Sequence, residues 1–287
     1  MKKKLFKFLN TTAYFMKEKT YLNGLFLLMR KIDKNIELED EEYYEVKSFL
    51  NKIPTNLKTY VDIGAGNGVN GSSVLKLAQT NDWGGLHLES GDVSVLTYLY
   101  RNYKNTKIGK IKVTPHNISH LLTGFGVTKS FGYLNLDIDS YDYEVLKEIL
   151  ENGFKPIVAS IEINETLPPP VFYFAKYSEN LEEYMSDYFF GCSLTAANYL
   201  MSKFDYTLSH IYGNNAFFLD KKHFNVVQKS EIDIYHDGYV QMKNRESKFY
   251  YNQKVDFLIK QEPSVVCSYF DELWKNKKTK YEMKIFP

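Results

Sequence analysis

The stretch Tyr60–Gly68, which reads YVDIGAGNG, decides the fold of this chain. A short apolar strand runs through Asp62 into a loop with glycine at every second position, Gly64, Gly66 and Gly68. Residues without a Cβ let the backbone turn sharply and approach a ligand closely. The carboxylate before the loop would repel a pyrophosphate but suits a ligand that presents an ammonium group and hydroxyls. The stretch therefore predicts a strand, a cofactor-binding loop and a helix in succession.

The segments that follow alternate between strand and helix patterns. Strands are expected at 59–63, 85–89, 111–115, 132–137 and 157–163, and helices at 71–80, at 93–103, from Asn117 and at 143–152. Such alternation predicts a parallel sheet with right-handed crossovers. Gly153 is well placed to end the last of these helices, with Pro156 just beyond it.

The pattern changes after residue 163. Residues 164–190 form a long connection with three consecutive prolines and many aromatic residues, and long ordered loops are often functional. A helix at 193–203 precedes strands at 206–211 and 216–219, which are joined by so short a turn that they must be antiparallel. We expect an α/β fold: a Rossmann-like, seven-stranded, mostly parallel sheet with an antiparallel last strand and helices on both faces.

The chain divides into three regions by pattern. These are a helical N-terminal extension at 1–50, a sheet domain at 51–222 with 164–190 as an insertion, and a helical C-terminal extension at 223–287. Within the last region, helices are expected around 254–260 and 268–275.

Composition excludes several classes of partner. There are 36 basic and 35 acidic residues and a formal net charge of +1, so no global field attracts nucleic acid. The apolar runs are too short or too interrupted for an integral membrane span or a signal peptide. Two separated cysteines suit a reducing compartment, and the cytoplasm is the expected location. A homo-oligomer is left open.

Acidic side chains follow the second and fourth strands. Glu89 ends the second strand, where a carboxylate can accept two hydrogen bonds from the adjacent hydroxyls of a ribose. The alternative is a surface acid that caps the next helix.

Asp137 and Asp139 follow the fourth strand and alternate to the same side, so repulsion would raise one pKa unless a cation, hydrogen bonds or water intervene. Two uses are open: a general base, or a divalent-metal site completed by Glu162 or Asn164. The structural alternatives are that Asp137 binds backbone amides and that Asp142 caps the next helix.

His210 stands at the end of a predicted strand and is a further candidate base, although a partly buried hairpin residue is the more ordinary role. Asn117 is also a candidate N-cap of its helix.

Four motifs in order resemble the class I S-adenosylmethionine-dependent methyltransferases, closest in style to the FkbM-like group. They are VDIGAGNG, LHLE ending at Glu89, LNLDIDSYDYEVLKEIL and NNAFFLD, and the resemblance spans residues 59–220. Gly66, Gly68 and Gly71 also fit the GxGxxG pattern of a dinucleotide-binding fold. Asp62 before the loop, the helical N-terminal region and the closing hairpin count against a nicotinamide-dependent oxidoreductase.

The resemblance implies S-adenosyl-L-methionine as cofactor. The loop would lie against its methionine portion, Glu89 would hold the ribose, and Asn117 and Ile118 would flank the adenine. The full set implied for the cofactor is Asp62, Gly64, Ala65, Gly66, Asn67, Gly68, Glu89, Ser90, Asn117, Ile118 and Asp137.

The resemblance also implies an O-methyltransferase for a small-molecule or glycan acceptor. Asp139, with Glu162, Asn164 or His210, would orient and deprotonate the acceptor hydroxyl. The 164–190 insertion would cover the acceptor, with Phe172, Tyr173, Phe174 and Tyr177 stacking on it. The alternatives are a methyltransferase for nitrogen or for a phosphorylated metabolite, and a non-catalytic cofactor-binding subunit.

A metal at Asp137, Asp139 and Glu162 is in doubt on the same resemblance. Metal-dependent O-methyltransferases carry an adjacent acid and amide after the fifth strand, whereas Ile163 separates Glu162 from Asn164 here.

Overall fold

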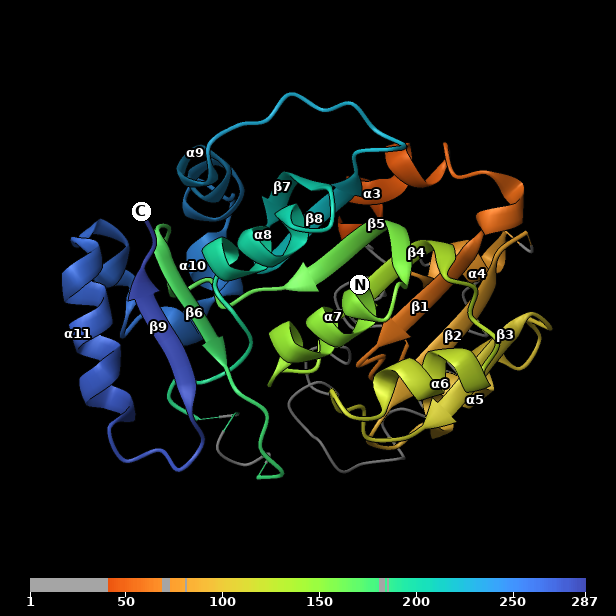
Figure 1. Ribbon diagram of the computed structural model, residues 1–287, viewed down its shortest axis with the longest axis horizontal. Coiled ribbons are helices and arrows are strands. Elements are labelled where there is room, and N and C mark those ends of the chain that lie inside the picture. The colour runs from red at the N-terminus through yellow and green to blue at the C-terminus, as the bar shows by residue number, and fades with distance from the viewer. Residues whose placement is uncertain (1–40, 69–72, 81, 181–183, 185) are drawn as a thin grey trace, which may run out of the picture.

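A seven-stranded sheet forms the centre of the molecule, and a two-stranded sheet lies beside it (Figure 1). The computed structural model describes residues 41–68, 73–80, 82–180, 184 and 186–287. The strand order is β3-β2-β1-β4-β5-β8-β7, and β8 alone runs antiparallel to its neighbours within this described sheet. The strands are β1 Thr59–Ile63, β2 Gly84–Glu89, β3 Thr106–Lys110, β4 Ser130–Leu136, β5 Lys155–Glu162, β7 Tyr206–Tyr212 and β8 Asn215–Asp220. This is the Rossmann-like sheet expected from the alternation of patterns.

Helices cover both faces because alternate residues of the central strands point to opposite sides. Tyr60 and Tyr133 pack in a cluster with apolar residues of one set of helices: α3 Glu41–Leu50, α4 Leu75–Gln79 and α5 Ser94–Tyr100. Val61 and Leu134 pack in a second cluster with another set: α6 Ile118–Gly124, α7 Asp142–Glu151 and α8 Leu194–Ser202. The short 3-10 helix η1 Thr55–Leu57 precedes β1. The N-terminal extension expected before residue 41 lies outside the described residues.

The third strand differs from the prediction. It spans Thr106–Lys110 rather than 111–115, and its register with β2 ends at the pair Glu89 and Lys110. Thr106–Lys110 lies at the edge of the sheet and has Ile108 as its one large apolar residue, so the more apolar segment after it was the misleading choice.

The C-terminal region is helical with one unexpected strand. Its elements are α9 Glu231–Tyr235, the π-helical turn η3 His236–Val240, α10 Arg245–Lys248, η4 Tyr250–Asn252, η5 Asp256–Lys260, α11 Pro263–Trp274 and β9 Tyr281–Ile285. Strand β9 pairs antiparallel with β6, Val171–Ala175, which lies in the 164–190 insertion (Figure 1). The C-terminal region therefore completes the fold of the insertion.

The insertion's aromatic residues are largely part of the core. Phe172, Tyr173 and Phe174 are all buried, and Phe174 stacks on Tyr143 at 4.2 Å between ring centroids. The expectation that these three side chains stack on an acceptor is wrong, because β6 turns them into the apolar cluster. Tyr177, just beyond β6, is partly exposed. Among the described helices, none has the length and apolar content needed to cross a membrane.

Candidate active site

The carboxyl ends of four parallel strands meet at one edge of the sheet. Strand β1 lies between β2 and β4, at the point where the chain reverses the direction in which it adds strands. Open α/β sheets bind their ligands in the crevice at such a point. Residues 64–68 follow β1, Glu89 ends β2, Asp137 follows β4 and Glu162 ends β5. The principal predicted residues therefore lie at one edge.

The glycine loop is pressed against the end of β4. Gly64 has a φ of +82°, and a Cβ added there would lie 1.6 Å from the carbonyl oxygen of Asp137. Gly66 has a φ of +54°, and a Cβ there would meet nothing among the described residues within 4 Å. The loop is thus fixed on its inner side and open above Gly66. This arrangement fits a ligand that lies across the loop.

Glu89 joins the glycine loop to the turn after β2. The Gly66 amide donates to Oε2 of Glu89 at 2.8 Å, and the Gly91 amide donates to Oε1 at 2.6 Å. Ser90 Oγ also donates to Oε1, at 3.4 Å. A carboxylate has about four acceptor positions, so these three bonds leave capacity for about one further donor. Glu89 therefore has the position that was predicted for a ribose-binding residue, with one acceptor position open. Its contact with a ribose stays a prediction.

Asp62 lies inside the sheet rather than in the mouth of the loop. It is 3% exposed, His87 Nδ1 lies 2.8 Å from its Oδ2, and Asn135 Nδ2 donates to its Oδ1 at 2.9 Å. His87 continues the network through Nε2 to the hydroxyl of Tyr60 at 3.1 Å. The expectation that Asp62 faces the ligand is corrected, because its carboxylate is buried between the neighbouring strands β2 and β4.

The other residues predicted for the cofactor surround this centre. Ala65 is buried, Asn67 is partly exposed and Ser90 is exposed. Ile118 is buried in the core. Asn117 occupies the N-cap position of α6, yet its Oδ1 accepts from the Thr114 amide at 2.8 Å and its Nδ2 donates to the Lys112 carbonyl at 2.9 Å. Asn117 thus braces the loop after β3 instead of capping the helix with its side chain.

Three carboxylates form a cluster at the ends of β4 and β5. Asp137, Asp139 and Glu162 each offer one oxygen, and these oxygens lie within 4.8 Å of one another. Oε1 of Glu162 accepts from Asn214 Nδ2 at 2.9 Å, while Oε2 is buried without a hydrogen-bond donor among the described residues. We call these three residues the acid cluster.

Asp137 and Glu162 lie close together in the acid cluster. Burial, followed by the charge of Asp139, raises the pKa of Asp137 well above its ordinary range. Burial, followed by the charge of Asp137, likewise raises the pKa of Glu162 well above its ordinary range. Both carboxyls therefore hold a proton more tightly than an exposed acid does.

Asp139 is the exposed member of the acid cluster and has a strained backbone. Its φ is +55°, a region that non-glycine residues adopt at a cost of roughly 1 kcal/mol. Asp142 holds this turn by accepting from the Ile138 amide at 2.9 Å and from the Ser140 amide at 3.1 Å. The prediction that Asp142 caps the next helix is therefore wrong: it binds the amides of the turn before it. Burial raises the pKa of Asp142 to about 6 despite these two bonds.

Asn164 is committed to the fold. Its Nδ2 donates to the carbonyls of Tyr188 and Phe190 at 2.7 and 3.2 Å, and its Oδ1 accepts from the hydroxyl of Thr166 at 2.6 Å and from the Thr166 amide at 3.3 Å. These four bonds fill the capacity of the amide. The expectation that Asn164 binds an acceptor or a metal is corrected: it fastens the 188–190 segment beside the site.

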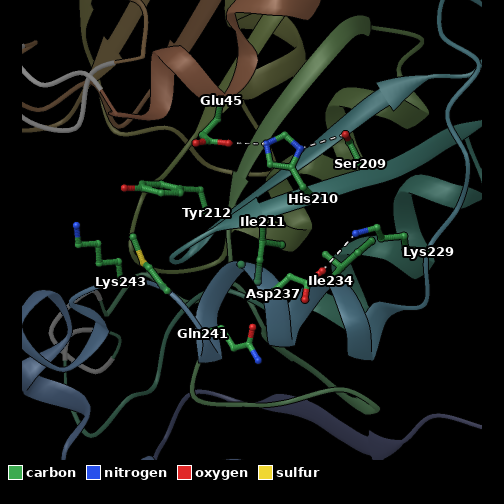
Figure 2. Close-up of a pocket in the computed structure, with 12 residues that line it drawn as sticks. Glu45, Ser209, His210, Ile211, Tyr212, Lys229, Ile234, Asp237, Gln241 and Lys243 are labelled. Carbon is green, nitrogen blue, oxygen red and sulfur yellow. Dashed lines mark hydrogen bonds and ion pairs between the residues drawn. The ribbon is translucent and has the colours of Figure 1, made fainter.

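His210 lies outside the acid cluster, in a separate cavity on β7 (Figure 2). Its ring stacks on Phe217 at 4.7 Å, with Nδ1 3.1 Å from Ser209 Oγ and Nε2 3.3 Å from Glu45 Oε2. Burial lowers the pKa of His210 to about 4. The residues that line this cavity include none of the acid cluster. The expected partnership between His210 and Asp139 is not formed.

Two residues near the site were missed in the sequence. Asn214 belongs to the β7–β8 turn, and only its place at the same edge as Glu162 could have indicated its role. Glu165 is 1% exposed, and its Oε1 accepts from Asn252 Nδ2 at 2.5 Å. Burial raises the pKa of Glu165 to about 7. Asn252 comes from the C-terminal region, so no local pattern could have revealed this contact.

Comparison with known proteins found matches among solved structures. No family model and no curated protein matches the chain. The structure is similar to that of an O-methyltransferase family protein from Burkholderia thailandensis, at 10% identity over 63% of this chain and 57% of that one, with a TM-score of 0.38. It is also similar to the plantazolicin methyltransferase BamL in complex with a triazolic desmethylPZN analog and SAH, at 11% identity over 91% and 88% of the two chains, with a TM-score of 0.39. A third similar structure is the fibrillarin/Nop5p complex, at 14% identity over 63% and 82%, with a TM-score of 0.38.

Proposed function

We propose that this chain is an S-adenosylmethionine-dependent O-methyltransferase that acts on a hydroxyl of a sugar, a glycan precursor or another small metabolite. One observation carries the proposal. The glycine loop touches, at Gly64, the carbonyl of Asp137, whose side chain belongs to the acid cluster. A donor-binding loop and a group that can accept a proton therefore lie side by side. The order of motifs that resembles the FkbM-like group supports the same proposal.

The residues at the loop fit the methyl donor. Glu89 has acceptor capacity for a ribose hydroxyl, and the open space above Gly66 among the described residues leaves room for the methionine portion. The nearby carboxylates of the acid cluster favour a ligand with positive charge. S-adenosylmethionine supplies a methyl group that is already bonded to a positively charged sulfur, so alignment accounts for most of the catalysis.

Asp139 is the proposed general base. The pKa values of Asp137 and Glu162 are raised, which favours their protonated forms, whereas Asp139 is exposed at the edge and held in place by the turn that Asp142 binds. The acceptor hydroxyl would give its proton to Asp139 as the oxygen forms its bond to the methyl carbon, while the sulfur–methyl bond breaks and its electron pair leaves with the sulfur of S-adenosylhomocysteine. General bases of this kind contribute about 10²–10⁴-fold to a rate.

Calorimetry tests the cofactor. S-adenosylhomocysteine should bind, and NAD should not. Glu89→Ala should weaken S-adenosylhomocysteine binding by about 100-fold, because hydrogen bonds to a charged group contribute about 1.5–3 kcal/mol each. Glu151→Ala, which removes an exposed glutamate on α7, is the matched control and should bind as the parent does. Tight binding of NAD without binding of S-adenosylhomocysteine would exclude a methyltransferase.

The acceptor is tested with a labelled methyl donor. A panel of sugar nucleotides, other hydroxylated metabolites and amines separates oxygen from nitrogen acceptors. Label that enters only the amines would replace the O-methyltransferase with an N-methyltransferase.

A divalent cation is the alternative occupant of the acid cluster. Three carboxylate oxygens within 4.8 Å suit Mg²⁺ or Ca²⁺, and the cation would then replace protons on the acid cluster. Titration with Mg²⁺, Ca²⁺ and Mn²⁺ decides between a cation and protonated carboxyls. Binding that is lost in Glu162→Gln supports the cation. No binding, with methyl transfer that survives EDTA, supports protonated carboxyls without a cation.

A further inference from the structure

A cavity of about 360 Å³ lies beside β7, the edge strand farthest from β3. It is bordered by α3, β7, the short helix α9 and the π-helical turn η3 (Figure 2). Small-molecule sites have volumes of roughly 300–1,000 Å³. The cavity is therefore large enough for one small ligand.

Two irregularities of the backbone meet at this cavity. The register of β7 with β8 shifts between Leu208 and His210, which places Ser209 in a β-bulge. On the opposite wall, η3 is a π-helical turn, and its Gly238 approaches so closely that a Cβ would lie 2.1 Å from the carbonyl oxygen of Ile211. Bulges and π-turns are concentrated at functional sites because each sacrifices regular hydrogen bonding. Here both border the same cavity.

The back wall is a line of three polar side chains. The His210 ring lies between Ser209 and Glu45, 3.1 Å from the hydroxyl and 3.3 Å from the carboxylate, while Phe217 supports one face of the ring (Figure 2). Because burial lowers the pKa of His210 to about 4, the imidazole is neutral at neutral pH. It adds no positive charge to the wall, and its buried Nε2 makes no hydrogen bond with the described residues.

The charges that line the cavity cancel. Glu45 and Asp237 carry two negative charges and Lys229 and Lys243 carry two positive charges, and Lys229 Nζ lies 3.2 Å from Asp237. A phosphate or nucleotide site needs an excess of positive donors, which these described lining residues lack. A neutral lining with donors and acceptors on several sides favours an uncharged ligand with many hydroxyls.

Apolar and amide groups complete the lining. Ile211, Ile234 and Met242 give it apolar surface, and Gln241 adds an amide that can both donate and accept. Carboxylate and amide groups pair with neighbouring hydroxyls, while the apolar residues can contact the carbon face of a ring. We propose that this cavity binds a small uncharged polyhydroxylated ring, a monosaccharide or a cyclic polyol. The proposal does not depend on methyl transfer, because the cavity shares no residue with the acid cluster.

Titration with matched rings tests the proposal. The probes are glucose, galactose, mannose and myo-inositol, with glucuronate and glucosamine as charged analogues. Binding is measured by calorimetry and by the Cε1–H nuclear magnetic resonance signal of His210, assigned by its loss in His210→Asn. At least one neutral ring should bind and shift this signal. The charged rings, glucuronate and glucosamine, should bind about tenfold more weakly than that neutral ring. A lack of heat and of shift with all four neutral rings overturns the proposal.

Two alanine variants locate the site. Gln241→Ala should weaken binding of the neutral ring by about tenfold, because it removes hydrogen bonds to hydroxyls. Gln79→Ala removes an exposed glutamine on α4 and should leave binding unchanged. Equal effects of the two variants, or equal affinity for neutral and charged rings, would show that this cavity does not select the ligand. S-adenosylhomocysteine binding, measured on the same samples, reports whether the donor site remains intact.

Discussion

Two pairs of carboxylates at one edge of the sheet differ in their hydrogen-bond donors. One pair belongs to β1 and β2, and the other lies at the ends of β4 and β5. Asp62 receives His87 and Asn135, and Glu89 receives the amides of Gly66 and Gly91. At the β4–β5 side, Asp137 and Glu162 face each other, and only Asn214 donates to Glu162 among the described hydrogen bonds. The first pair has several hydrogen-bond donors, whereas burial and mutual repulsion favour the protonated forms of the second pair. Neighbouring donors, rather than residue type, thus separate a charged binding group from a proton-holding one.

The largest effect is expected at Asp139. Asp139→Asn should lower the methyl-transfer rate by about 10²–10⁴-fold, because the amide cannot accept the acceptor proton. Binding of S-adenosylhomocysteine should be unchanged by calorimetry. Asp205→Asn is the matched control, since Asp205 is also exposed and also has a positive φ, +67°. A parental rate in Asp139→Asn would remove Asp139 from the reaction.

Glu165 extends the comparison to a buried acid beside the site. Its pKa is raised from 4.5 to about 7 by burial, so the folded state binds its proton more tightly than the unfolded state. Stability from this group is present below pH 4.5 and is lost as the pH rises to about 7. Glu165→Gln should therefore be more stable than the parent at pH 8, by up to about 3 kcal/mol, with no difference near pH 4.

Urea unfolding at the two pH values measures this difference. The exposed Glu246→Gln is its control and should keep the parental pH dependence. If the free energy of unfolding of Glu165→Gln depends on pH as that of the parent does, Glu165 is ionised in the folded protein.

Asp62 tests the β1–β2 side of the comparison. Asp62→Asn should lower the free energy of unfolding by about 1–3 kcal/mol, because an amide cannot accept from both His87 and Asn135 without conflict. Asp82→Asn changes an exposed ion pair with Lys58 and should have little effect. If urea unfolding gives the same change in free energy for both variants, the buried network contributes no more to stability than the exposed ion pair does.

Glu162 tests the β4–β5 side and should respond with the opposite sign. Its raised pKa means that its contribution to stability falls as the pH rises. Glu162→Gln removes a carboxyl whose pKa is raised, so it should gain about 1 kcal/mol of stability over the parent between pH 6 and pH 8. A loss of stability relative to the parent over the same range would contradict a raised pKa at Glu162.

The sequence was most informative about the central strands. Strands β1, β4 and β5 are buried on both faces, so their nearly continuous apolar residues identified them. Edge strands carry no such signal: β3 was placed five residues late, and β9, whose partner β6 is far away in sequence, was missed. Locating these strands, and β2 beside them, also located their carboxyl ends, which is why the site residues Glu89, Asp137 and Glu162 were found.

What each site residue does could not be predicted in the same way. Asp62 and Asn164 were assigned to ligands because they stand at strand ends, but donors and acceptors from other strands and loops already occupy them. His210 was expected at the same edge of the sheet as the acid cluster, but it lies on β7, which β8 separates from β5. These outcomes depend on neighbours across the sheet, which a linear pattern does not specify.

The pairing of β6 with β9 has a consequence for how the protein is made. Val171 pairs with Ile285, so this contact closes a very long loop, and such contacts form slowly. The Ala175 amide donates to Gly191, and the Gly191 amide donates to Ser140, next to Asp139. During synthesis on the ribosome, the acid cluster emerges well before β9, so this support of the site forms after the cluster itself has been made.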